Sequence, residues 1–174
     1  MNTDETLNSA PPTLRAAAAI STSRAAIARL EDRVEIIDAL YRFAAGQDLH
    51  DPMLLRSAFA ENAILDFVQP AKRFGVDLQP FAGRENIVDS IWAALAELDT
   101  THTVTNPRVD IKGNEATLFS LVEAQHVLRQ DRGRNLLLKN FYWVWLERAG
   151  EKWAITRMRI ENAWHAGDPK VLFP

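Results

Sequence analysis

The chain contains no cysteine among its 174 residues. Disulfides, thiolate nucleophiles and cysteine-ligated zinc or iron–sulfur centres are therefore excluded. The chain also lacks an excess of positive charge, because 20 lysines and arginines stand against 23 acidic residues, for a net charge of -3, and the basic residues form no run. Nucleic acids and anionic membranes are therefore not expected as partners.

Long apolar runs and cofactor motifs are absent as well. The apolar run at 16–20 is too short for a signal-peptide core or a membrane span, so we expect a cytoplasmic location. The four histidines, at positions 50, 102, 126 and 165, show no H-x-x-x-H spacing. The sequence has no glycine-rich phosphate loop and no nucleophile elbow. We therefore expect neither a bound metal nor a cofactor.

The residues that are present indicate one globular domain after a tail. The composition, 47% hydrophobic and 25% charged, is ordinary for a soluble protein. Residues 1–25 are rich in Ala, Ser, Thr and Pro with few large apolar side chains, which predicts a flexible tail. Residues 26–174 are expected to form a single domain.

The hydrophobic periodicity changes along this domain from helical to extended. Helices are expected at about 25–45, 52–60 and 87–98. A strand is expected at 63–68, followed by a long loop at 69–81 of the kind that often forms a lid or a pocket wall. Segments with strand character follow at 100–111, 115–130, 135–148 and 152–163. Helices followed by an antiparallel meander of four strands predict an α+β fold.

Asp48 is the first candidate for chemistry. It follows Tyr41 by seven residues, or two helical turns, so both project from one helix face, with the small Ala44 and Ala45 between them. A carboxylate is unfavourable at a helix C-terminus, which indicates a compensating partner or a function. Capping of the following turn is an equally good explanation of Asp48.

Two strand histidines are the second candidates. The alternation of the threonine-rich segment at 100–105 places His102 on the same strand face as Val104 and Asn106. His126 shares a face with Val122 and Ala124. An imidazole next to a carboxylate is a general base with its own orienting group. A lone strand histidine is more commonly a hydrogen-bonded core residue, and sequence alone does not place Asp48 beside His102.

From about 33 to 169 the chain resembles the SnoaL-like branch of the NTF2-like superfamily. The resemblance rests on the order of several segments: 36–41, Gly46-Gln47-Asp48, 58–63, Gly83-Arg84-Glu85, 101–107 and 152–155 followed by Arg157. Scytalone dehydratase, lindane dehydrochlorinase and bile-acid dehydratase are the nearest functional models of the family. The resemblance implies a cone-shaped α+β barrel, in which a curved, mostly antiparallel sheet wraps around the N-terminal helices.

The resemblance also implies roles for individual residues. Asp48 and His102 match the aspartate and the strand histidine that these dehydratases use in cofactor-free elimination. Tyr41 lies where related dehydratases often keep a tyrosine, and His126 matches a second polar residue of the pocket. Phe43 falls near the position of the first-helix lysine of the dehydrochlorinase, a departure that argues against halide elimination.

The function expected from these residues is that of a cofactor-independent lyase. An Asp-His dyad would remove a proton, and water or another small fragment would leave an aromatic or polycyclic molecule. The five tryptophans suit such a ligand, although tryptophan more commonly packs in a core. The alternatives are a non-catalytic ligand-binding or assembly subunit of the same fold, and an isomerase or cyclase. The resemblance further implies a homodimer or homotrimer.

Overall fold

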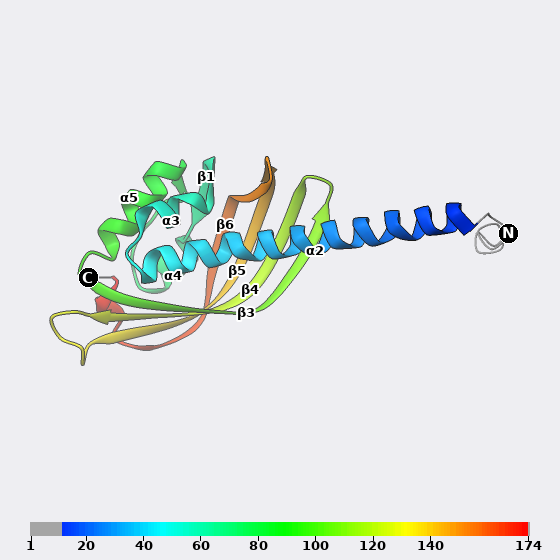
Figure 1. Cartoon of the computed structure of the whole chain (residues 1–174). Coiled ribbons are helices and arrows are strands. Elements are labelled where there is room, and N and C mark those ends of the chain that lie inside the picture. Colours follow the sequence, from blue (N-terminus) through cyan, green and yellow to red (C-terminus); the bar gives the residue numbers. More distant parts are fainter. Residues whose placement is uncertain (1–11, 174) are drawn as a thin grey trace. The chain divides into compact units, whose positions relative to one another are not determined.

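The computed structural model of the chain describes residues 12–173, and Figure 1 shows the succession of its elements. The helices are α2 (Pro12–Asp48), α3 (Pro52–Ser57), α4 (Val68–Arg73), α5 (Arg84–Ala94) and the short 3-10 helix η1 (Pro169–Val171). The strands are β1 (Phe59–Asp66), β2 (Phe81–Ala82), β3 (Leu98–Lys112), β4 (Glu115–Leu128), β5 (Asn135–Ala149) and β6 (Lys152–Gly167). The four-stranded meander predicted at the end of the chain is present as β3 to β6.

The strands form one mixed sheet in the order β2-β1-β6-β5-β4-β3. Successive strands from β3 to β6 pair antiparallel, whereas β1 pairs parallel with β6. Register shifts, which bend strands, occur between Thr105 and Arg108 and between Trp145 and Leu146. The sheet is curved (Figure 1), but β2 and β3 remain as two edges, so it does not close into a barrel. The predicted α+β class is confirmed.

The last turns of α2 form the centre of the core. Ile36, Ala39, Leu40 and Phe43 are buried at helical spacing and pack in one cluster with inward-facing residues of the sheet and of α5. Trp153 of β6 is fully buried in the same cluster. The helix therefore enters the core with one face and carries Asp48 at its end.

Gly46 lets α2 and α3 approach closely. A Cβ atom on Gly46 would lie 2.5 Å from the backbone nitrogen of Leu55. Asp51 then starts α3, accepting hydrogen bonds from the backbone nitrogens of Met53 and Leu54. The chain thus reverses direction directly after Asp48.

The part of α2 before Glu35 forms a separate unit. Helix α2 begins at Pro12 and not near residue 25, consistent with the strong helix propensity of the alanine run at 16–19. Ile20, Ile27, Leu30 and Val34 are exposed on it. The predicted flexible tail thus overlaps this helix, and its residues 1–11 lie outside the described part of the chain. No helix within residues 12–173 combines the length and apolarity needed to cross a membrane.

The segment expected to be a loop at 69–81 begins within a short helix, α4. Pro70 made a helix unlikely from the sequence, but it falls in the first turn, where the backbone N–H has no helical acceptor to lose. Pro70 and Ala71 are buried. The remainder of the segment is irregular up to β2 and supplies part of a pocket wall, as its length predicted.

Candidate active site

The structure places Asp48 and His102 in direct contact, although 54 residues separate them. His102 Nδ1 lies 2.6 Å from Asp48 Oδ1, and the His102 backbone nitrogen donates to Asp48 Oδ2 at 2.7 Å. The Thr100 hydroxyl donates to Asp48 Oδ1 at 2.9 Å. The carboxylate at the end of α2 is therefore bound on three sides by the beginning of β3.

The environment of Asp48 favours its ionised form. Burial alone raises its pKa, but hydrogen bonds from His102 and Thr100, together with the charge that His102 can carry, bring the pKa below its ordinary value. An ionised carboxylate can only accept, so His102 carries its proton on Nδ1 and donates it to Asp48. In neutral His102, Nε2 is then the free basic nitrogen.

His102 lines a cavity of about 240 Å³ between the sheet and the surrounding helices. Its side chain is only 3% exposed. Most of the lining is aliphatic or aromatic and comes from α2, α4, the segment before β2, α5, the sheet and the chain end. The polar side chains of the lining are Gln47, Ser90, His102, His126, Asn140 and Tyr142. A mostly apolar cavity with a few convergent polar groups is the usual form of a small-molecule site.

His126 reaches the same cavity from β4. Its ring centre is 6.2 Å from that of His102, with the planes at 79°. Burial, and to a smaller extent the charge of His102, lowers the pKa of His126 from 6.5 to about 4. His126 is therefore neutral at neutral pH. Its Nδ1 is buried and has no hydrogen-bond partner among residues 12–173.

Tyr41 does not reach the cavity. It is 47% exposed on α2, since the inward face of the helix is formed by Leu40, Phe43 and Gln47. Asp48, seven residues further along, lies at the end of α2, where its side chain contacts β3.

Tyr142 is the tyrosine that lines the cavity, and the sequence analysis did not identify it. It is 3% exposed and packs edge-to-face with Phe43, with 6.1 Å between ring centres. Burial raises its pKa well above the ordinary value, against a smaller lowering by its hydrogen bond with Asn140, so the phenol stays protonated. The alternation of Asn140, Tyr142 and Val144 along β5 places all three on one strand face, and this was the sequence signal that could have identified Tyr142.

Phenylalanines, and not tryptophans, form the aromatic walls. None of the five tryptophans lies in the described lining, whereas Phe43, Phe67, Phe81 and Phe173 do. Phe173, just after η1, stacks on Phe67 and Phe74 at 6.0 and 4.7 Å between ring centres. The expectation that tryptophans would contact the ligand is therefore wrong for this cavity, and the chain end contributes a wall that the sequence did not indicate.

The described residues contain no cluster of three or more His, Asp or Glu side chains with a geometry suited to a metal ion. His102 and His126 line the cavity, whereas His50 and His165 do not. The site is thus built from one carboxylate, two imidazoles, one phenol, the hydroxyls of Ser90 and Thr100, and amide groups.

Comparison with known proteins agrees with this architecture. A model of the SnoaL-like domain matches residues 28–159. Terrestric acid biosynthesis cluster protein E of Penicillium crustosum is 30% identical over 146 residues, covering 80% of this chain and 88% of that protein.

Solved structures share the fold at lower identity. A candidate scytalone dehydratase from Novosphingobium aromaticivorans superposes with a TM-score of 0.71 at 16% identity, covering 82% of this chain and 91% of that chain. A hexachlorocyclohexane dehydrochlorinase from Novosphingobium barchaimii superposes with a TM-score of 0.68 at 18% identity, covering 82% and 94%. The NTF2-like fold implied by the sequence resemblance is confirmed. Since the family model spans most of the chain, the protein belongs to the SnoaL-like family.

Proposed function

We propose that the protein is a cofactor-independent lyase that uses His102, oriented by Asp48, to start an elimination reaction on an aromatic small molecule. The observation that carries the proposal is the 2.6 Å contact between His102 Nδ1 and Asp48 Oδ1 at the wall of a mostly apolar cavity. This contact holds the proton of His102 on Nδ1 and leaves Nε2 as the nitrogen that can act as a base.

In the proposed reaction His102 Nε2 removes a proton from a carbon next to a carbonyl or aryl group. The electron pair of the broken C–H bond forms a C=C bond, and the C–O bond to a departing hydroxyl breaks. The hydroxyl takes a proton from a neutral donor and leaves as water. Tyr142 and His126 are the candidates for that donor, because both are neutral and line the cavity. Tyr41 is no longer a candidate, because it is exposed.

The cavity suggests a substrate of one or two rings. About 240 Å³ is below the roughly 300–1,000 Å³ of typical drug-sized sites, which favours a small aromatic over a large polycyclic molecule. The phenylalanine walls suit flat rings. No lysine or arginine belongs to the described lining, and by the sequence resemblance Phe43 falls near the position of the dehydrochlorinase lysine, so the proposal favours loss of water over loss of halide.

The names of relatives support this class of reaction. One structural neighbour is described as a candidate scytalone dehydratase and another as a dehydrochlorinase, both elimination enzymes by name. The relative from Penicillium crustosum belongs to a biosynthesis cluster for a small molecule. An isomerase or cyclase would use the same base and differ in its product.

The rival proposal is a non-catalytic binding or assembly subunit. It predicts that the dyad has a purely structural role. The deciding experiment is turnover of a panel of hydroxylated one- and two-ring compounds, followed by mass spectrometry for loss of 18 Da. Elimination in the wild type that disappears in His102→Ala supports the lyase. A product of unchanged mass indicates the isomerase, and tight binding without turnover indicates the binding subunit.

We also propose that the protein acts in the cytoplasm as a homodimer or homotrimer. The support for self-association is an outer aromatic patch, formed by Phe119, Phe141, Trp143 and Trp145 on the sheet face opposite the cavity. Phe141 and Trp143 are exposed, and Phe119 packs against Trp143 with the rings tilted by 51° and 4.7 Å between ring centres. Exposed aromatic patches of this kind commonly mark protein interfaces.

A further inference from the structure

The turn after Asp48 is fastened by His50. The backbone of His50 has a φ of 54°, in the left-handed region, and its nitrogen donates to the Gln47 carbonyl at 3.2 Å. The His50 ring contributes a second contact to the same carbonyl, with Nδ1 at 2.9 Å. Its ring edge packs on Trp92 of α5, with 6.1 Å between ring centres. His50 thus closes the C-terminus of α2 two residues beyond Asp48.

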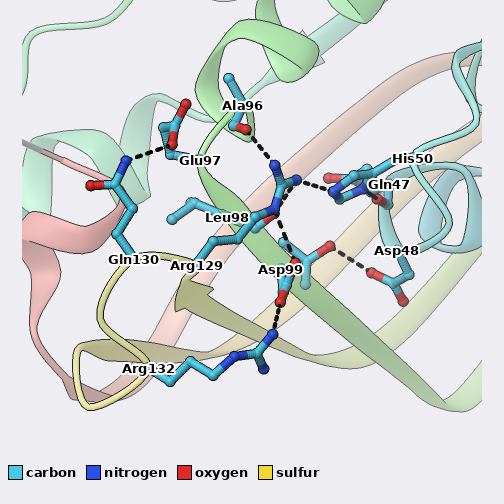
Figure 2. Close-up of polar contacts among 11 residues, drawn as sticks. Gln47, Asp48, His50, Ala96, Glu97, Leu98, Asp99, Arg129, Gln130 and Arg132 are labelled. Atoms are coloured by element: carbon cyan, nitrogen blue, oxygen red, sulfur yellow. Dashed lines mark hydrogen bonds and ion pairs between the residues drawn. The ribbon is translucent and has the colours of Figure 1, made fainter.

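Arg129, just after β4, links this turn to the start of β3, as Figure 2 shows. Its guanidinium donates to the Ala96 carbonyl at 2.8 Å, to the Leu98 carbonyl at 2.9 Å and to Asp99 Oδ1 at 3.0 Å. Its Nη2 also contacts His50 Nε2. Arginine can only donate, so His50 accepts at Nε2 and donates from Nδ1 to the Gln47 carbonyl. The neutral imidazole is therefore the form that fits both contacts.

The Arg129–His50 contact joins the two chain segments that carry the dyad. Asp48 lies on one segment, between Gln47 and His50, and Thr100 and His102 follow Leu98 on the other. All three hydrogen bonds to the Asp48 carboxylate come from β3. Because a helix C-terminus disfavours a carboxylate, Asp48 stays in place only while the end of α2 remains against β3.

We propose that Arg129 and His50 are positioning residues, which hold the end of α2 on the beginning of β3 and so keep the Asp48 carboxylate on His102. The inference rests on the proposed function, in which the dyad is the base. Neither residue touches the reacting atoms, so their effect is on the orientation and basicity of His102.

A matched control exists within the same cluster. Arg132 also pairs with Asp99, with 2.7 Å between Nη2 and Oδ2, but its side chain is 73% exposed and contacts neither His50 nor Leu98 in the described network. Arg129→Ala and Arg132→Ala remove the same charge from the same partner. Only the first breaks the link to α2.

The first measurement is proton NMR of the full-length protein without substrate. The short hydrogen bond between His102 and Asp48 should give a strongly downfield Nδ1–H signal, assigned by its loss in His102→Ala. We expect this signal to be lost or shifted upfield in Arg129→Ala and unchanged in Arg132→Ala. Folding of each variant is checked by circular dichroism.

The second measurement is steady-state kinetics on an identified substrate. Misplacing an orienting group typically costs about tenfold or more, so kcat should fall by at least that factor in Arg129→Ala, with KM within about threefold. His50→Asn, which tolerates a positive φ but is too short to reach Arg129, should behave alike. His50→Gln, one methylene longer, should recover part of the signal and of kcat.

The outcomes separate this inference from the proposed function. If Arg129→Ala and His50→Asn keep both the downfield signal and kcat, the positioning role is wrong while the lyase proposal stands. The positioning role is also wrong if Arg132→Ala causes the same losses. If His102→Ala itself retains turnover, the lyase proposal fails. Should Arg129→Ala not fold, the pair His50→Asn and His50→Gln decides.

Discussion

At the scale of single residues, Asp48 is an acceptor surrounded by donors. One hydroxyl, one backbone N–H and one imidazole N–H donate to its two oxygens. This arrangement selects an ionised carboxylate, and the ionised carboxylate in turn selects the tautomer of His102. If the proton of His102 were on Nε2 instead of Nδ1, the cavity would lose its basic nitrogen.

Replacement of the carboxylate by an amide tests this selection. Asp48→Asn keeps the shape of the side chain but favours the other His102 tautomer, so kcat should fall about a hundredfold or more, as for loss of a general base. The measurement is kcat for the substrate found in the turnover panel. Asp51→Asn is the control, because asparagine also caps α3, and its kcat should stay within twofold. Full activity of Asp48→Asn would contradict the dyad.

The two tyrosines make a paired prediction. Tyr142→Phe removes a buried hydroxyl that lines the cavity and should lower kcat about tenfold or more if the phenol donates to the leaving oxygen. Tyr41→Phe removes an exposed hydroxyl outside the lining and should leave kcat unchanged. Equal effects of the two substitutions would assign the donor role to another group, with His126 as the next candidate.

The buried His126 predicts acid sensitivity. Its pKa falls from 6.5 to about 4 on folding, so between these values the unfolded chain binds a proton that the folded protein does not. Its contribution to stability is therefore complete above pH 6.5 and decreases as the pH falls toward 4, by up to about 3 kcal/mol.

Urea denaturation at several pH values measures this effect. The free energy of unfolding of the wild type should fall more steeply between pH 6.5 and 4 than that of His126→Phe, whatever the cost of the substitution at neutral pH. Parallel slopes for wild type and His126→Phe would mean that His126 titrates normally.

At the scale of elements, helix α5 divides two hollows. Ile91 and Leu95 line the main cavity and also a second hollow of about 200 Å³, whose other walls include His50, Trp92 and Arg129. Gln47 of α2 is the third shared residue. The partition is thus only one side chain thick, so its residues should limit the length of the ligand.

Shortening the partition should widen ligand selection. Ile91→Ala should admit compounds with one additional ring, because it opens the main cavity toward the second hollow. The readout is the change in KM or binding affinity across a series from one to three rings. Val88→Ala also shortens a buried β-branched residue of α5 but lies outside the lining, so it should change stability without changing selectivity.

The elements differ in how well the sequence predicted them. The strands β3 to β6 follow from alternation because each buries one face, and His102 and His126 were placed on the correct strands. Helix α4 and the wall around Phe173 were missed, because their apolar residues are fixed by contacts with distant segments and not by periodicity. Tyr142 was missed because it lies within an aromatic run in which Phe141, Trp143 and Trp145 occupy the outer face, and the sequence does not show which face of β5 lines a cavity.

At the scale of the whole molecule, the sheet has two aromatic faces with different surroundings. The inner face contributes Tyr142 to the cavity, and the outer face carries the outer aromatic patch. Arg157 and Arg159 lie near Trp145 and Trp143 on that outer face, and Trp143 Nε1 donates to Glu161 at 3.2 Å. Charges of both signs beside aromatic rings suit contact with an identical face of a second copy.

Self-association through this face predicts a specific effect of charge. Trp143→Glu should reduce the molar mass measured by light scattering to that of the monomer, near 19.6 kDa. Met53→Glu, which places the same charge on the exposed surface of α3, should leave the molar mass unchanged. A wild-type protein that is already monomeric would contradict the proposal directly.

The close crossing of α2 and α3 has a consequence for anyone searching this chain for essential positions. Any side chain at Gly46 would collide with the backbone of Leu55 and tilt the helix end that carries the carboxylate. In a mutational screen scored by product formation, position 46 would therefore rank with the reactive groups although it contributes no functional group. Sensitivity to substitution at position 46 would reflect the close approach of the α2 and α3 backbones and not a catalytic role of the residue.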